Sequence, residues 1–246
     1  MHTPEALSAL ERDLREIFGT RLRSIVGYGL AAEEPHGHAQ TAHAHGHEQP
    51  ATHTLAIVDA ITADDLRACA ARVDRWHATG IATPLVLAAH EFEQSLDAFP
   101  YEFGAILADH VLLSGPNPFE KVRIDVNDVR RACEVQARSH LLHLREGYIE
   151  TRGRADALSV LIVRSAAPFA ALLRSIARLQ GQSSRDLAAV GRHAERVLNL
   201  PGGAVTEVLS MAHVKEISND AATRIFPSYL DAVERLVAFV DGWTAA

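Results

Sequence analysis

The stretch Leu22-Arg23-Ser24-Ile25-Val26-Gly27-Tyr28-Gly29-Leu30-Ala31-Ala32 joins an apolar run to a turn with two closely spaced glycines. A second apolar run, Thr54-Leu55-Ala56-Ile57-Val58, follows it after an insert. Short apolar runs bounded by glycine or polar residues are typical of buried strands. The two runs therefore predict neighbouring strands, and Pro84–Ala88 predicts a third.

Helical patterns separate the predicted strands. Pro4 in the first turn and Gly19 after the last apolar residue delimit one helix. Thr62 with Asp64 and Asp65 opens a second helix, with negative charge at its positive N-terminal end, and Gly80 ends it. The remaining elements expected in this half are a short helix at His90–Leu96 and strands around Tyr101–Ile106 and His110–Leu113.

The second half of the chain has a helical pattern throughout. The turn residues Ser114-Gly115-Pro116-Asn117-Pro118 predict a domain boundary. After it, helices are expected at Asp125–Glu150, Ala155–Gln180, Ser184–Leu198, Ala204–Ile217 and Asp220–Thr244, with Pro168 kinking or interrupting the second. The predicted fold is thus an α/β domain at 1–118, with an insert near 33–53, followed by an α-helical bundle at 119–246.

Composition excludes several classes of protein. The 246 residues are 48% hydrophobic and 22% charged, as in globular proteins, and the net charge of −7 argues against a nucleic-acid partner. No run of about 20 uncharged residues predicts a membrane span, and the N-terminus does not have the pattern of a secretory signal. Two cysteines, Cys69 and Cys133, fit a reducing compartment, so a cytoplasmic location is expected.

The strand–turn motif resembles that of polymerase-beta-type nucleotidyltransferases, in which an apolar strand leads to Gly-Ser and then to Asp-x-Asp on the next strand. The resemblance implies a nucleotidyltransferase-like fold and a nucleotide ligand. In that family two aspartates, two residues apart, point to one face of a strand and hold divalent metal ions against a nucleoside triphosphate.

The motif in this chain departs from the family at the metal ligands. Leu30 occupies the serine position, and Thr52 and Thr54 fall where the aspartates are expected. Neutral threonine hydroxyls are poor ligands for magnesium, which prefers charged oxygen ligands. We therefore expect no bound magnesium and no conventional nucleotidyl transfer.

Two further segments, Ser95–Phe103 and His143–Tyr148, resemble an uncharacterised group of nucleotidyltransferase-like proteins, so the resemblance covers roughly residues 20–180. It implies that the first segment contains a strand that pairs against the metal face and that Glu102 is the closest candidate for a third carboxylate. Arg145, with Arg138 and Arg131 at intervals of seven on one helix, is a candidate for contacting phosphates. The candidate nucleotide-binding residues are Gly27, Gly29, Leu30, Glu102 and Arg145.

Each candidate also has a purely structural interpretation. Gly29 is required by a tight turn as readily as by a phosphate. Glu102 could simply be solvated, and nearby glutamates could pair with the three arginines along the helix. Three functions remain open: an inactive descendant with a regulatory, nucleotide-binding or partner-binding role, an active nucleotidyltransferase with an atypical metal site, and a metal-binding accessory protein.

The third function rests on the insert. Six of the 14 histidines lie within 18 residues, at His36, His38, His43, His45, His47 and His53. Neutral imidazole is a good ligand for zinc or nickel, and the x-separated pairs offer several chelating combinations. The glycines, prolines and polar residues of the insert predict a mobile loop without its own core, which could also bind metal only opportunistically.

Overall fold

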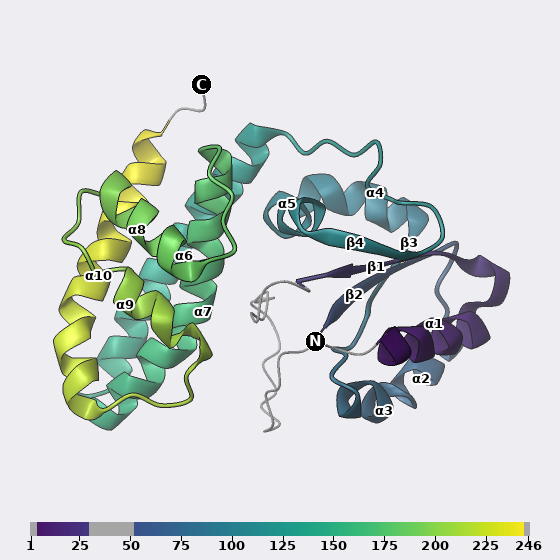
Figure 1. Cartoon of the computed structure of the whole chain (residues 1–246), viewed down its shortest axis with the longest axis horizontal. Coiled ribbons are helices and arrows are strands. Elements are labelled where there is room, and N and C mark those ends of the chain that lie inside the picture. The colour runs from purple at the N-terminus through teal and green to yellow at the C-terminus, as the bar shows by residue number, and fades with distance from the viewer. Residues whose placement is uncertain (1–3, 30–51, 244–246) are drawn as a thin grey trace. The chain divides into compact units, whose positions relative to one another are not determined.

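The computed structural model describes residues 4–29 and 52–243, and the chain divides into two compact units (Figure 1). The division falls between Ile124 and Asp125. Phe119, Val122 and Ile124 belong to the core of the first unit, which therefore continues a few residues beyond the proline-rich turn at 114–118. Leu30 and five of the six histidines of the insert, His36, His38, His43, His45 and His47, lie outside the described residues.

Unit 1 contains four strands and short helices, and the three strands predicted at Leu22–Val26, Thr54–Val58 and Pro84–Ala88 are present. The strands are β1 (Leu22–Tyr28), β2 (His53–Val58), β3 (Leu85–Ala88) and β4 (His110–Ser114). The helices are α1 (Pro4–Phe18), the 3-10 turn η1 (Gly19–Arg21), α2 (Ala63–Ala70), α3 (Val73–Ala78), α4 (Ala89–Ala98) and α5 (Pro100–Ala108).

The four strands form one sheet in the order β3-β2-β1-β4. The central strand β1 is antiparallel to both neighbours, whereas β2 and β3 are parallel. Helices α4 and α5 lie on one face of the sheet, and α1, α2 and α3 lie on the other (Figure 1). Both faces of β1 and β2 are therefore buried, which explains their nearly continuous apolar sequences.

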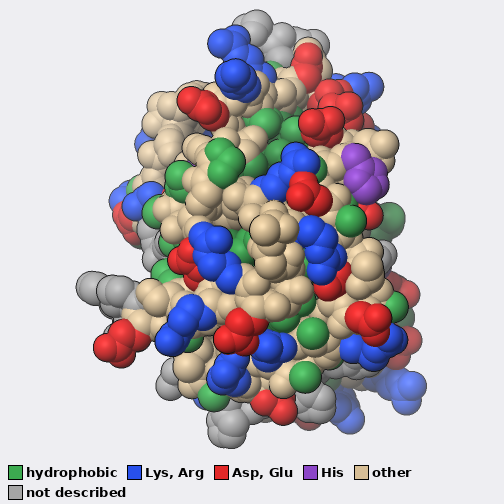
Figure 2. All heavy atoms as spheres, turned by 90° about the vertical axis from the view of Figure 1, so that its right-hand side faces the viewer, with side chains coloured by type: hydrophobic (Ala, Val, Ile, Leu, Met, Phe, Trp, Pro, Cys, Tyr) green, Lys and Arg blue, Asp and Glu red, His purple; other side chains and the backbone are tan. Residues whose placement is uncertain are grey.

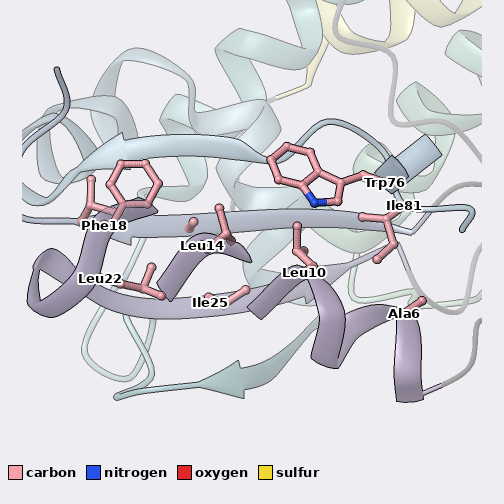
Figure 3. Packing of buried hydrophobic residues seen from close by; sticks show 10 residues of the cluster. Ala6, Leu10, Leu14, Phe18, Leu22, Ile25, Trp76 and Ile81 are labelled. Carbon is pink, nitrogen blue, oxygen red and sulfur yellow. The ribbon is translucent and has the colours of Figure 1, made fainter. Parts of the chain in front are cut away.

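Each face has its own hydrophobic cluster. Towards α1, the helix residues Leu10, Leu14 and Phe18 pack on Ile25 of β1, and Trp76 of α3 closes the cluster (Figure 3). Towards α4 and α5 the cluster consists of Val26, Tyr28, Leu55, Ile57, Phe92, Phe103, Ile106 and Phe119. The side chains of β1 and β2 thus alternate between two apolar layers.

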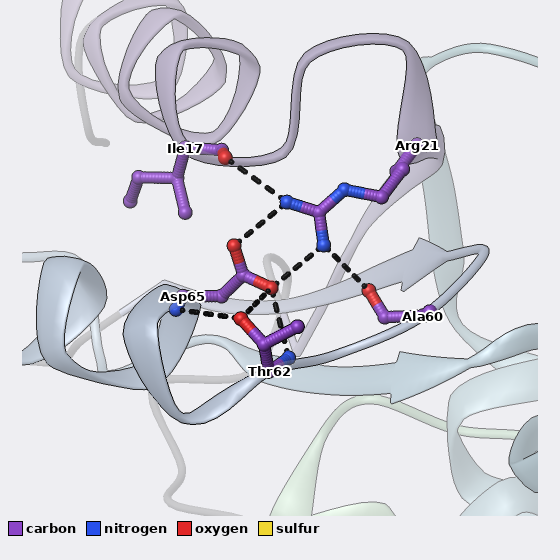
Figure 4. Close-up of polar contacts among 5 residues, drawn as sticks. All are labelled: Ile17, Arg21, Ala60, Thr62 and Asp65. Atoms are coloured by element: carbon purple, nitrogen blue, oxygen red, sulfur yellow. Dashed lines mark hydrogen bonds and ion pairs between the residues drawn. The ribbon is translucent and has the colours of Figure 1, made fainter.

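One polar junction ties the start of β1 to α2 (Figure 4). The two terminal nitrogens of Arg21 donate to the two carboxylate oxygens of Asp65, each at 2.7 Å. Asp65 also accepts from the Thr62 backbone N–H at 2.8 Å, and the Thr62 hydroxyl accepts from the Asp65 N–H at 3.2 Å, which completes a capping box at the predicted start of this helix. The hydrogen bonds from Arg21, and those from Thr62, hold the pKa of Asp65 well below its usual range.

Two predictions about unit 1 are wrong. The segment Tyr101–Ile106 is helical, because Pro100 begins α5 and the apolar residues Phe103, Ile106 and Leu107 follow at helical spacing. Its apolar content had favoured a strand. The single helix expected from Thr62 to Gly80 is divided into α2 and α3, and Leu66 of α2 is exposed.

Unit 2 is a helical bundle. Its helices are α6 (Val126–Glu150), α7 (Ala155–Leu179), α8 (Leu187–Val197), α9 (Thr206–Leu209) and α10 (Asn219–Gly242), with a 3-10 turn η2 (Ser210–His213). The helix predicted at Ala204–Ile217 is therefore shorter than expected. Pro168 does not interrupt α7, since the long helical segments on both sides tolerate the loss of one backbone hydrogen bond.

Helix α7 is the central helix of this bundle and contacts α6, α8 and α10. By length and composition alone it could cross a membrane, and it is the one described helix that passes this test. Ten of its residues, among them Ile162, Phe169 and Leu173, are buried within unit 2. A core helix has the same composition, so α7 is weak evidence for a membrane span.

A polar network lies inside the bundle. His140 of α6 stacks on Phe169, with ring centroids 5.3 Å apart, and its Nε2 lies 2.8 Å from the Tyr229 hydroxyl. That hydroxyl also lies 3.1 Å from Ser165 Oγ. Burial, with a smaller contribution from the neighbouring His143, lowers the pKa of His140 to about 4, so the imidazole is neutral at physiological pH.

We expect the unfolding free energy to fall as the pH is lowered from about 6.5 to about 4. In this window the unfolded chain protonates His140 but the folded chain does not, which removes about 3 kcal/mol. Chemical denaturation at a series of pH values measures the loss. His140→Gln should remove most of this slope and the exposed neighbour variant His143→Gln should retain it; equal slopes in both variants would contradict the assignment.

Candidate functional site

The end of the sheet at Gly29 gathers the residues that the sequence motif singled out. Tyr28 of β1 lies opposite His53 of β2 and opposite His110 of β4. Gly27, one residue earlier, lies opposite Thr54 and Val111. Two rows of side chains thus cross three strands at this end of the sheet, one row on each face.

The first row, His53, Tyr28 and His110, lies on the face covered by α4 and α5. The rings of Tyr28 and His53 stack with centroids 5.6 Å apart. Burial raises the pKa of Tyr28 to about 12, so its phenol is a neutral hydrogen-bonding group and not a base. The row therefore has an uncharged phenol with one imidazole on each side of it.

His110 has a defined orientation in this row. Its Nδ1 lies 3.0 Å from the Leu107 carbonyl oxygen, and its ring lies 4.8 Å from the Phe119 ring. Because a carbonyl only accepts hydrogen bonds, Nδ1 carries the proton and Nε2 is the acceptor of the neutral ring. Asp109 directly precedes His110 and is half-buried, which places one carboxylate next to the row.

The second row contains Thr54, one of the two positions at which the sequence resemblance predicts an aspartate. Thr54 is 0% exposed and Thr52 is also buried, on the same face as Ala56 and Val58, which pack in the cluster under α1. The Thr54 hydroxyl oxygen has no hydrogen-bond partner among the described residues. These hydroxyls are consequently enclosed in a hydrophobic layer and do not offer ligands to a solvated metal ion.

Carboxylates are absent from all four strands in the described part of the chain. Asp59 follows β2 at the opposite end of the sheet, where it forms an ion pair with Arg23 and its N–H donates to the Arg21 carbonyl at 2.9 Å. The predicted third carboxylate, Glu102, lies on α5 and not on a strand, so the expectation that it completes a metal face from a neighbouring strand is wrong.

The other predicted residues have defined places in the fold. Gly29 has a φ of +65°, a left-handed conformation that favours glycine, so the turn itself requires this residue. Arg145 lies in unit 2, and its guanidinium donates to Glu234 at 2.7 Å. The structure therefore brings together Gly27, Gly29 and His53, whereas Glu102 and Arg145 occupy helices.

Tyr28 and His110 were not recognised from the sequence as site residues. The sequence gives no local sign of this site, because His110 becomes a neighbour of Tyr28 only through strand pairing over a separation of more than 80 positions.

A groove of about 620 Å³ in unit 2, between the loop at 200–204 and Asp231 of α10, contains none of the predicted residues.

The antiparallel β1–β2 pair with its glycine turn, the mixed sheet between helices and the helical second unit define a polymerase-beta-type nucleotidyltransferase-like fold. The solved structure of spectinomycin adenyltransferase AAD(9) from Enterococcus faecialis, with ATP and spectinomycin, has this fold and matches with a TM-score of 0.52. The match covers 95% of this chain and 99% of that chain at 12% sequence identity, which establishes the fold alone. No protein-family model and no curated protein matches the sequence.

Thr54→Val should raise the unfolding free energy by about 1 kcal/mol, because valine has the same shape and removes a buried hydroxyl that lacks a partner. Thr62→Val is the matched control: its hydroxyl caps α2, and we expect a loss of about 1 kcal/mol. Denaturant unfolding measures both. Destabilisation by Thr54→Val would indicate that the Thr54 hydroxyl has a stabilising partner.

Proposed function

We propose that this protein is a catalytically inactive nucleotidyltransferase-like protein that binds a nucleotide and acts in regulation or partner recognition. The observation that supports it is the enclosed, uncharged Thr54 on a sheet whose four described strands carry no carboxylate. Removing two anions removes most of the attraction that offsets the dehydration of magnesium. Nucleotidyl transfer without such metal ions would lack its main electrostatic stabilisation.

The proposed nucleotide site is the end of the sheet at Gly29. Its candidate phosphate contacts are the imidazoles of His53 and His110, which flank the neutral Tyr28. Nδ1 of His110 is already engaged by Leu107, so a proton acquired by the ring would lie on Nε2 and could be donated to a phosphate oxygen. The ATP named for the similar solved structure supports the choice of ligand class.

Other partners are less well supported. On the face shown in Figure 2, basic and acidic side chains are interspersed, so this face does not present the basic surface that nucleic-acid binding favours. The free thiols Cys69 and Cys133 support the expected cytoplasmic location.

We expect ATP, GTP or CTP to bind in EDTA with weak, salt-dependent affinity, because charge and not a metal ion provides the attraction. Calorimetric titration at low and physiological salt measures this. His110→Ala should weaken binding about tenfold, the value of one charge-assisted hydrogen bond, whereas the exposed His77→Ala control should not change it. Micromolar affinity that is insensitive to salt and to His110→Ala would contradict this site.

The alternative, an active enzyme with an atypical metal site, has a direct assay. Protein incubated with labelled ATP, magnesium or manganese and acceptors that include spectinomycin should show no transfer. Turnover that disappears in Asp109→Asn or Glu102→Ala, with nucleotide affinity retained, would establish the enzyme and overturn the proposed inactivity.

A second candidate function is metal binding through the six histidines at 36–53, favoured by their spacing and by His53, whose strand position adjoins the proposed site. We expect zinc or nickel to bind with at least micromolar affinity near pH 7.5 and to dissociate as the imidazoles protonate below about pH 6.5. Deletion of residues 36–47 should abolish binding without changing metal-free stability. Equal metal uptake by the deletion variant, measured by calorimetry, would exclude this function.

A further inference from the structure

Exposed apolar side chains are concentrated on α6. Of the eleven large hydrophobic residues that are exposed in the described chain, five lie on this helix. Val135, Leu142 and Ile149 are 64%, 63% and 74% exposed and are spaced seven residues apart. At 3.6 residues per turn they form one stripe along the helix, which we call the 135–149 stripe.

The 135–149 stripe lies on the side of α6 opposite to its buried residues. Cys133, Ala137, Leu141 and Leu144 face the bundle, and α6 contacts α7 and α10 through this side. By helical spacing, Val135 and Leu142 lie about half a turn away from Cys133 and Ala137. The bundle therefore leaves the stripe uncovered, unlike Tyr148, whose ring stacks on Phe226 at 4.3 Å.

Charges of opposite sign flank the stripe. Arg131, Arg138 and Arg145 lie three or four residues from the apolar positions and border one side. Glu146 and Glu150 border the other side at helical spacing, and Asp128 lies in line with the stripe, seven residues before Val135. The arginines already have intramolecular partners, Asp128, Asp241 and Glu234 respectively, at exposed positions where solvent screens the pairs.

We propose that the 135–149 stripe is the contact surface of a homodimer in which two copies of α6 pack side by side in parallel. A two-fold axis parallel to the helices places the arginine side of one copy against the acidic side of the other, as for e and g positions in a parallel coiled coil. Arg145 then meets Glu146 and Glu150 of the partner subunit. An antiparallel pair would instead place arginines against arginines.

The size of the surface limits its strength. A helix of 25 residues is about 37 Å long, and three apolar residues with charged borders bury less area than a standard stable interface. The dimer should therefore dissociate at micromolar concentrations. Its formation does not depend on the proposed nucleotide site in unit 1.

Sedimentation velocity of the full chain over a concentration series tests the dimer. Leu142→Glu should raise the dimer dissociation constant more than about tenfold, because it places like charges at the two-fold axis. Leu66→Glu, the same change at an exposed leucine of α2, is the matched control and should leave dissociation unchanged. A wild-type chain that stays monomeric at 100 micromolar (an upper concentration of the assay, roughly one hundred times a micromolar dissociation constant) would overturn the proposal and assign the stripe to another occupant.

Charge reversal and cross-linking test the parallel orientation. Arg145→Glu and Glu150→Arg should each weaken the dimer, and the double variant should restore it. In a background without Cys69 and Cys133, single cysteines at 135, 142 and 149 should each form disulfide-linked dimers. In an antiparallel dimer, only the variant with a cysteine at 142 would form a disulfide with its own copy, and a mixture of the variants with cysteines at 135 and 149 would form disulfide-linked heterodimers. This result would overturn the proposed parallel arrangement.

Discussion

Burial of β1 and β2 on both faces is the constraint from which the other properties of unit 1 follow. Helices cover the sheet from two sides, so each residue of these strands enters one of two apolar layers. A carboxylate in such a layer would lose its hydration without gaining a partner, at a cost of several kcal/mol. Neutral residues at 52 and 54 fit this environment, and these are the positions at which the sequence resemblance predicts metal-binding aspartates.

For the proposed function, the two faces of β1 and β2 differ in the groups that they can offer to a ligand. Thr52 and Thr54 are enclosed with Ala56 and Val58, whereas the alternate positions, Tyr28, His53 and His110, bear aromatic and imidazole groups at the end of the sheet. A ligand at this end would meet hydrogen-bonding rings and a neutral phenol. Such groups can hold a phosphate or a base but offer little stabilisation to a transferred nucleotidyl group.

Local sequence signals predicted the elements that depend on local physics. The apolar runs predicted β1, β2 and β3, and Thr62 with Asp64 and Asp65 predicted the start of α2. The segment at 101–106 was predicted wrongly because most of its residues are apolar, and in so short a run the helical spacing of Phe103, Ile106 and Leu107 is hard to distinguish from the pattern of a buried strand. The row formed by His53, Tyr28 and His110 could not be predicted, because it depends on strand register between distant segments.

The junction of Arg21, Thr62 and Asp65 has a consequence for the fidelity of strand pairing. In a sheet with one wet face, a slip of one residue would expose apolar side chains to water, and this penalty fixes the alignment. Here both faces are apolar, so hydrophobicity alone discriminates poorly between β1–β2 alignments. The bidentate Arg21–Asp65 pair and the bond from Asp59 to the Arg21 carbonyl join the ends of these strands at a single offset. The junction therefore favours this one alignment of β1 and β2 over alignments that would bury a similar apolar area.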